Sequence, residues 1–226
     1  MPGDITGPSA DLAGARMNGS GLFVSVDGPG GAGKTTTVTL ISAQLAERGM
    51  PVHATTEPTR TQLGELIRAG TCTYTGMALA CLIAGDRHHH LASEIRPARQ
   101  AGAIVLCDRY LPSSLVLQRI DGLDWDTIWH LNTGVDRPDL AVILNADPAV
   151  LAERISQRGS PHSRFEREPS GSRSESELYK YTAARLTGLG WTVCEIDTTA
   201  RTAGEVAAIV TDRILSIVAD RSPHDS

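Results

Sequence analysis

Short apolar runs alternate with longer segments of helical periodicity along the chain. The apolar runs predict strands at 22–26, 52–54, 103–107, 140–144 and 191–196. Apolar residues at helical spacing predict helices at 36–48, 61–69, 77–100, 124–131, 148–158, 175–186 and 203–219. Strands that are almost entirely apolar are typical of parallel sheets covered on both faces. The alternation therefore predicts an α/β fold with a doubly wound, five-stranded parallel sheet between helices.

The composition changes at the two ends of this pattern and once inside it. Residues 1–20 are rich in Gly, Pro, Ser and Asp without an apolar central run, which predicts a flexible tail and not a signal peptide. Residues 220–226 predict a second flexible tail. Residues 21–219 contain no repeat and no second compositional block, so they are predicted to form one domain. The polar, Arg-rich segment 158–173 predicts a mobile lid or, alternatively, a solvated connector.

Charge and cysteine content exclude several classes of protein. The formal net charge is -5 and there is no long basic run, which argues against a nucleic-acid polymer as partner. No apolar stretch is long enough to span a membrane. The four cysteines have no metal-ligand spacing and predict reduced thiols. We therefore expect a cytoplasmic protein.

A glycine-rich segment follows the first predicted strand directly. Residues 28–35 match the phosphate-binding pattern G-x-x-x-x-G-K-[ST], called the P-loop. Glycines let backbone N–H groups turn toward phosphate oxygens, and the next helix begins with its positive end at the same place. Lys34, one of two lysines among 21 basic residues, adds a charge for the β- and γ-phosphates, and the Thr35 hydroxyl is a candidate Mg²⁺ ligand. The predicted ATP-binding residues are Gly28, Gly30, Gly31, Ala32, Gly33, Lys34, Thr35 and Thr36.

Charged side chains follow the second and third predicted strands, at the edge where open α/β sheets bind ligands. Glu57 is predicted either to act on the substrate side, directly or through another residue, or to cap the following turn. Asp108 could hold Mg²⁺ and Arg109 could clamp phosphate oxygens, or the two could form a surface ion pair. Arg87 lies in an otherwise apolar helical stretch and needs an acidic or ligand partner. These groups suit phosphoryl transfer better than a GTPase switch, since the chain has no Asn-Lys-x-Asp motif.

Three consecutive histidines, residues 88–90, follow Arg87 in the same predicted helix. Successive helical residues point about 100° apart, so these side chains cannot chelate one metal as an i, i+4 pair would. They are predicted to form a partly exposed polar patch near the acceptor, where one could still touch a substrate.

Together these motifs resemble the thymidylate kinase family of P-loop nucleoside monophosphate kinases. The similarity spans residues 21–219 and rests on the P-loop and on residues 57–58, 85–87, 104–110, 113–114, 137–140 and 164–166, in that order. It implies the three-layer P-loop NTPase fold, and transfer of the ATP γ-phosphoryl group to a pyrimidine nucleoside 5′-monophosphate, foremost dTMP. It also implies use of Mg²⁺ and often a homodimer.

The resemblance also implies roles for individual residues. Because the P-loop holds no arginine, the lid residues Arg158 and Arg164 are the candidates for a charge that this family places in either segment. The implied catalytic residues are Lys34, Asp108, Arg109, Arg158 and Arg164, with Thr35 and Asp108 on Mg²⁺. The implied substrate contacts are Asp27, Glu57, Arg87, Arg109, Ser114 and Gln118.

Three positions depart from the family pattern on the acceptor side. Where family members place a P-loop carboxylate, an aromatic ring on the base and a Tyr near the sugar, this chain has Gly30, Ile83 and Leu117. Either the acceptor is a modified or ribose pyrimidine nucleotide, such as a 5-substituted CMP or UMP, or other side chains fill these roles. A kinase of a small-molecule hydroxyl and a nucleotide-switched binding module are further alternatives. A hydroxyl acceptor would need a general base, whereas a phosphate acceptor needs mainly arginine contacts.

Overall fold

The computed structural model describes residues 21–158 and 171–221. Within them, one parallel sheet contains β1 (Phe23–Asp27), β2 (Val52–Thr56), β3 (Ile104–Asp108), β4 (Leu140–Asn145) and β5 (Val193–Asp197). The strand order is β2-β3-β1-β4-β5, so β2 and β3 lie on one side of β1 and β4 and β5 on the other. The predicted α/β fold with a five-stranded parallel sheet is confirmed. Such sheets bind ligands at the carboxyl ends of their strands, at the point where the strand order reverses.

Each strand runs one or two residues beyond the apolar run that predicted it. β1, β3 and β5 end on Asp27, Asp108 and Asp197, while β2 ends on Thr56 and β4 on Asn145. The register pairs Thr56 with Asp108 and Asn145 with Asp197, because ladder hydrogen bonds involve the backbone and do not depend on an apolar side chain. The predicted strand ends are therefore too early, and the carboxyl edge of the sheet carries polar groups.

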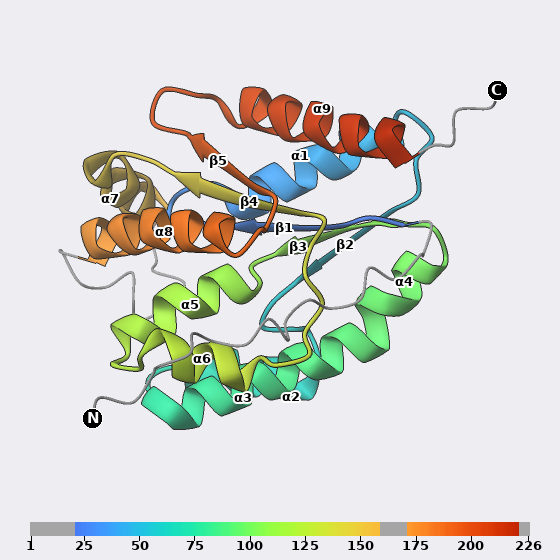
Figure 1. The fold of residues 1–226 in the computed structure, drawn as a ribbon. Coiled ribbons are helices and arrows are strands. Elements are labelled where there is room, and N and C mark those ends of the chain that lie inside the picture. The colour runs from blue at the N-terminus through green and yellow to red at the C-terminus, as the bar shows by residue number, and fades with distance from the viewer. Residues whose placement is uncertain (1–20, 159–170, 222–226) are drawn as a thin grey trace, which may run out of the picture.

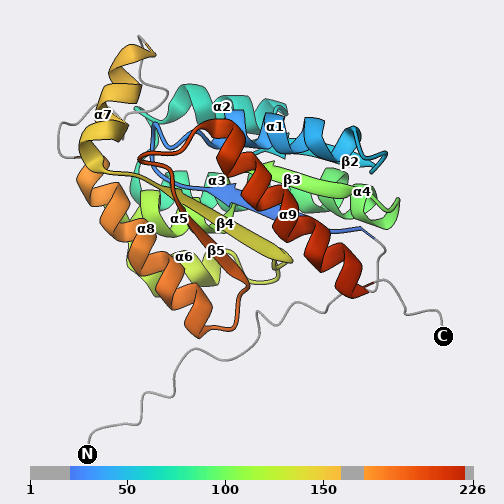
Figure 2. The same cartoon turned by 90° about the horizontal axis from the view of Figure 1, so that it is seen from above.

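Helices cover both faces of the sheet (Figure 1). On one face lie α1 (Lys34–Ala46) and α9 (Ala203–Arg221), and Figure 2 shows α9 crossing over the strands. Val24 and Val26 pack with these two helices, whereas Phe23, which precedes Val24, and its register partner Val105 belong to the core on the opposite face. This alternation is the period of two expected of a strand, and it divides the core into two layers.

The opposite face is covered by helices that carry much of the candidate site. They are α3 (Gly76–His90), α4 (Arg96–Gln100), α5 (Leu111–Ile120), α6 (Trp125–Leu131) and α8 (Gly171–Gly188). Two further helices, α2 (Gln62–Gly70) and α7 (Pro148–Gln157), pack on α3 and α8 respectively. Asp124 caps α6 and Thr61 caps α2, each side chain accepting a backbone N–H of the first turn.

Two helical features differ from the sequence prediction. The pattern gave no helix at 111–120, because a Pro and two Ser resemble a loop, yet α5 forms there with Pro112 in its first turn, where its missing N–H costs nothing. The single helix predicted at 77–100 is interrupted by a π-helical turn at Leu91–Ile95. Pro97 has no N–H to continue the regular hydrogen-bond ladder, which explains the interruption just before it.

The boundaries of the lid and of the C-terminal tail also differ from prediction. α9 continues two residues into the predicted tail, where the guanidinium of Arg221 donates to Asp139 at 2.5 Å. α8 begins at Gly171, so the last three residues of the predicted lid are helical. Residues 159–170 of the predicted lid and the residues before 21 and after 221 lie outside the described residues. No helix in the described part is long and apolar enough to cross a bilayer.

Candidate active site

The P-loop connects the end of β1 to the start of α1. Gly31 has φ 77°, and a Cβ there would lie 2.7 Å from the carbonyl oxygen of Leu151 in α7. Gly33, at the start of α1, has φ 90°, a conformation that L side chains rarely adopt. The glycine pattern thus allows both the left-handed turn and the close approach of α7. The loop leads into the N-terminus of a 13-residue helix, the arrangement that binds phosphate groups.

Lys34, Thr35 and Asp108 meet where β1 and β3 lie side by side. The Lys34 ammonium is buried and donates to the carbonyl oxygen of Pro29 at 2.7 Å. The Thr35 hydroxyl donates to Asp108 Oδ2 at 2.5 Å, and Asp108 Oδ1 has no hydrogen-bond partner among the described residues. A hydroxyl and a carboxylate with a buried, unused oxygen are the hard ligands that Mg²⁺ prefers. The residues present therefore fit the predicted Mg²⁺ site.

Asp27, at the end of β1, is buried and binds the start of α5. Its Oδ1 accepts hydrogen bonds from the N–H of Tyr110 at 2.9 Å, the N–H of Ser113 at 3.0 Å and the Ser113 hydroxyl at 2.7 Å. Burial raises the pKa of Asp27, and these hydrogen bonds offset part of the rise. Asp27 thus holds α5 against β1, and the substrate contact expected of it stays a prediction.

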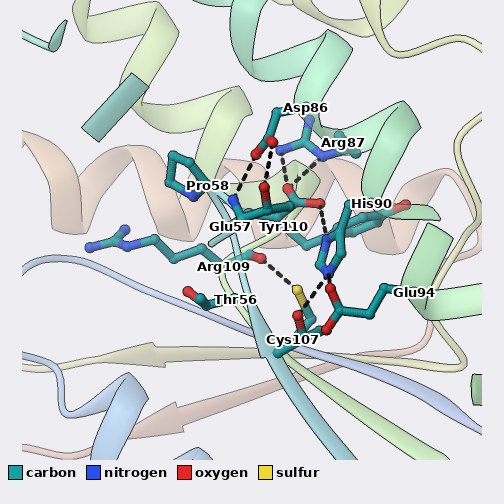
Figure 3. A network of polar contacts seen from close by, with 12 residues as sticks. Thr56, Glu57, Pro58, Asp86, Arg87, His90, Glu94, Cys107, Arg109 and Tyr110 are labelled. Carbon is teal, nitrogen blue, oxygen red and sulfur yellow. Dashed lines mark hydrogen bonds and ion pairs between the residues drawn. The ribbon is translucent and has the colours of Figure 1, made fainter. Parts of the chain in front are cut away.

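Arg87, in α3, is buried and bound by polar groups from three other segments (Figure 3). Its Nε donates to Glu57 Oε2 at 2.8 Å, Nη1 to Asn132 Oδ1 at 2.5 Å and Nη2 to the Ser114 hydroxyl at 2.8 Å. The guanidinium carbon also lies 5.1 Å from the centre of the Tyr110 ring. The expectation that Arg87 needs an acidic or ligand partner is confirmed, because Glu57 supplies the carboxylate. Arg87 joins the end of β2 to α5 in this way.

A second line of polar contacts runs from Glu57 toward the surface (Figure 3). His90 Nδ1 lies 3.2 Å from Glu57 Oε1, and His90 Nε2 lies 2.8 Å from the Thr55 hydroxyl and 3.4 Å from Glu94. Partial burial works to raise the pKa of Glu94, but hydrogen bonds from Thr55 and His53 outweigh it and lower the pKa. The predicted exposed patch is wrong for His90, which is fully buried, and right for the two preceding histidines. Sequence periodicity did not show that β2 would place Thr55 beside this ring.

Glu57, His90 and Cys107 could in principle form a buried metal site, since their ligand atoms lie within 4.8 Å of one another. The contacts favour a hydrogen-bond network instead. Glu57 is already paired with Arg87, and the Cys107 thiol donates to the carbonyl oxygen of Arg109 at 3.0 Å. Burial, together with the charge of Glu57, raises the pKa of Cys107 well above its ordinary value, which disfavours the thiolate that a metal needs.

Arg109 and Gln118 lie at the other candidate positions of the site. Arg109, directly after β3, has φ 73°, a left-handed conformation that is rare for a side chain of this size and clusters at functional sites. Gln118, in α5, is buried, and its Oε1 has no hydrogen-bond partner among the described residues. Ser114, one turn earlier in α5, is bound to Arg87. α5 therefore presents both a fixed hydroxyl and an unused amide oxygen.

The two candidate lid arginines have different outcomes. Arg158 is described and exposed at the C-terminal end of α7, whereas Arg164 lies outside the described residues. The neighbouring Arg154 turns away toward β5, where it donates to the hydroxyl and carbonyl oxygens of Thr198 at 3.1 and 2.8 Å. Which lid arginine contacts phosphate stays a prediction.

The structure adds buried residues that sequence reasoning missed. Asp86 accepts the N–H and hydroxyl of Thr59 at 2.7 and 2.6 Å, and so fixes the segment after β2. Glu175, in α8, accepts the N–H of Gly30 at 2.9 Å. The sequence contained a signal for Asp86, because Asp86 directly precedes Arg87 in the motif of residues 85–87. Asn132 and Glu175 had none, since only the packing of distant segments buries them.

Comparison with known proteins agrees with this geometry. The family model described as thymidylate kinase matches residues 26–200. A probable thymidylate kinase of Caldivirga maquilingensis is 37% identical over 162 residues, which cover 70% of this chain and 78% of that protein. The chain belongs to the thymidylate kinase family. A thymidylate kinase of Geobacillus thermodenitrificans is 41% identical over 147 residues, covering 61% of this chain and 65% of that protein.

Membership of the thymidylate kinase family confirms the resemblance inferred from the motifs. It also confirms the predicted class of enzyme, an ATP-dependent phosphotransferase on the P-loop fold. A binding module that uses nucleotide only to change shape is therefore not favoured.

Proposed function

We propose that the protein transfers the γ-phosphoryl group of ATP to dTMP and releases ADP and dTDP. The observation that carries the proposal is the hydrogen bond between Thr35 of the P-loop and Asp108 at the end of β3. It brings the donor-binding loop to the strand end that also carries Arg109 and leads into α5. The relatives named thymidylate kinase support dTMP as the acceptor over a modified or ribose pyrimidine nucleotide.

Positioning and electrostatics supply most of the catalysis in this proposal. The transition state of phosphoryl transfer is loose, and its charge spreads over the equatorial oxygens of the transferring group. Lys34 at the P-loop and Arg109 at the end of β3 are the cations that stabilise this charge, with Arg158 and Arg164 as lid candidates. Thr35 and Asp108 would hold Mg²⁺, which neutralises charge on the β- and γ-phosphates when bound.

The acceptor would lie between α3 and α5. Gln118 Oε1, buried and without a described partner, suits the imide N–H of thymine, and the Ser114 hydroxyl suits a polar group of the nucleotide. The Nε, Nη1 and Nη2 atoms of Arg87 all donate hydrogen bonds to protein groups. We therefore propose that its main role is to position Ser114, and that contact with the base edge is a lesser one. Glu57 then acts on the acceptor through Arg87. The phosphate acceptor arrives ionised, so the site needs no general base.

An initial-rate comparison of acceptors tests this function. ADP release should depend on the acceptor, and kcat/KM should be highest for dTMP among dTMP, dUMP, UMP and CMP. The Lys34→Ala variant serves as the control for contaminating kinases. A higher kcat/KM for UMP or CMP, or ADP release at the same rate without acceptor, would overturn the proposal.

We also propose a cytoplasmic homodimer. Its support is two large apolar residues on the packed helices α2 and α3, Leu66 and Met77, which have 46% and 50% of their surface exposed. Large exposed apolar side chains on adjoining helices are typical of an interface. Light scattering should give twice the mass of the chain, and Met77→Glu should shift the protein toward monomer.

A further inference from the structure

A buried carboxylate reaches the P-loop from a helix near the other end of the chain. Glu175 lies in α8, its side chain is 4% exposed, and its Oε2 accepts the N–H of Gly30 at 2.9 Å. The two residues are 145 positions apart in sequence. Burial and the phosphates of a bound nucleotide both disfavour a negative charge at this place. A buried carboxylate bonded to the donor loop is expected to do more than fill space.

The same helix is fixed to the acceptor side one turn later. Tyr179, fully buried, donates from its hydroxyl to Ser113 Oγ at 3.1 Å, and Ser113 donates to Asp27 at 2.7 Å. Burial raises the pKa of Tyr179. The charge of Arg109 lowers it and the charges of Asp27 and Glu175 raise it, so all three groups lie within electrostatic reach of Tyr179. α8 therefore contacts the P-loop through one side chain and the start of α5 through another.

The hydrogen bond gives Gly30 a partner on the protein. P-loop N–H groups ordinarily turn toward phosphate oxygens, whereas that of Gly30 points to the carboxylate of Glu175. The bond fixes the first half of the loop to α8. Since α8 is also bound to α5, the distance between the donor loop and the helix that carries Ser114 and Gln118 depends on this contact.

We propose that Glu175 is a positioning residue for phosphoryl transfer, whose carboxylate holds Gly30 and so sets the P-loop relative to α5. The proposal rests on the kinase function given above. A displacement of about 1 Å in the reacting groups can lower a rate by about 10²-fold. The loss should fall on kcat, because either nucleotide can still bind to its own half of the site. An amide oxygen accepts the same hydrogen bond, so the conservative amide should restore most of the rate.

The test compares Glu175→Ala and Glu175→Gln with Glu177→Ala, which removes an exposed carboxylate two residues away on the same helix. We expect kcat to fall about 10- to 100-fold in Glu175→Ala, with KM for ATP and dTMP changing less than about threefold. Glu175→Gln should recover to within about fivefold of wild type. Thermal unfolding of each variant sets an assay temperature at which all are folded.

A second readout is independent of activity. The Gly30 amide proton should resonate downfield in the wild type, shift upfield in Glu175→Ala and stay near its place in Glu177→Ala. Wild-type kcat in Glu175→Ala, a loss confined to KM, an amide variant as slow as the alanine variant, or an unmoved Gly30 resonance would each overturn the proposal. If the wild type and Glu177→Ala both lack dTMP-dependent ADP release, the proposed function fails instead, and the Gly30 resonance still tests the contact.

Discussion

The buried ion pair of Arg87 and Glu57 makes a quantitative prediction about stability. Both side chains are nearly inaccessible, and Arg87 has further partners in Asn132, Ser114 and the face of Tyr110. Arg87→Met removes the positive charge but leaves the Glu57 carboxylate buried. Breaking a buried pair from one side costs about 3–5 kcal/mol, because the remaining charge is uncompensated. For a chain of this length that corresponds to a fall of roughly 6–20 °C in Tm.

The double variant decides whether the cost comes from the pair. Arg87→Met with Glu57→Gln leaves no charge unpaired, so it should be about 1–3 kcal/mol more stable than Arg87→Met alone. Urea unfolding followed by circular dichroism measures both variants and the wild type. Arg60→Met is the control, since Arg60 pairs with Glu65 at 3.7 Å with both side chains largely exposed. That change should cost at most about 0.5 kcal/mol.

Two results would refute this reasoning. A loss below about 1 kcal/mol in Arg87→Met would mean that the guanidinium does not compensate a buried charge. A double variant less stable than the single one would mean that Glu57 is stabilised mainly by groups other than Arg87, among which His90 is the nearest.

Three further predictions follow from the site. Lys34→Ala and Arg109→Ala should each lower kcat about 10²-fold or more in the coupled assay, the effect of losing one electrostatic stabiliser, and near-normal turnover would contradict the roles. The raised pKa of Asp27 means that the folded state binds its proton more tightly than the unfolded chain, so ionisation costs stability as pH rises from 3.8 through the raised pKa. Across that window Asp27→Asn should gain stability relative to wild type, and a difference independent of pH in urea unfolding would be inconsistent with this. Exposed Cys81 should react with a thiol reagent in the native protein and buried Cys107 only after unfolding, as mass spectrometry of labelled peptides can show.

The sheet and the P-loop were predictable because each depends on local sequence. The apolar runs of β3 and β4 are unbroken and that of β1 is interrupted only by Ser25. The glycine spacing at Gly31 and Gly33 corresponds to positive φ angles in the structure. Strand ends were less predictable, because backbone pairing continues through Asp27 and Asp108 whatever their side chains. The polar edge that results is nevertheless the part of the sheet that carries the chemistry.

Residues that depend on distant contacts were not predictable. His90 reads like its two exposed neighbours, but its side chain on α3 contacts Thr55 of β2 and is buried there. α5 lacks a clear helical pattern, since Pro112 lies in its first turn and Ser113 binds Asp27. Glu175 differs from Glu177, the other acidic residue of its helix, in that α8 turns it toward the P-loop. Hydrophobic periodicity describes one helix or strand at a time, whereas the surroundings of these residues depend on contacts between two or three elements.

Identification of the reaction product tests the central claim most directly. The protein, ATP, Mg²⁺ and dTMP are incubated together, and the nucleotides are separated and identified by mass spectrometry, with Lys34→Ala treated in parallel. The account predicts ADP and dTDP in equal amounts for the wild type and neither at a comparable rate for the variant. ADP without dTDP, or dTDP formed equally well by Lys34→Ala, would contradict it.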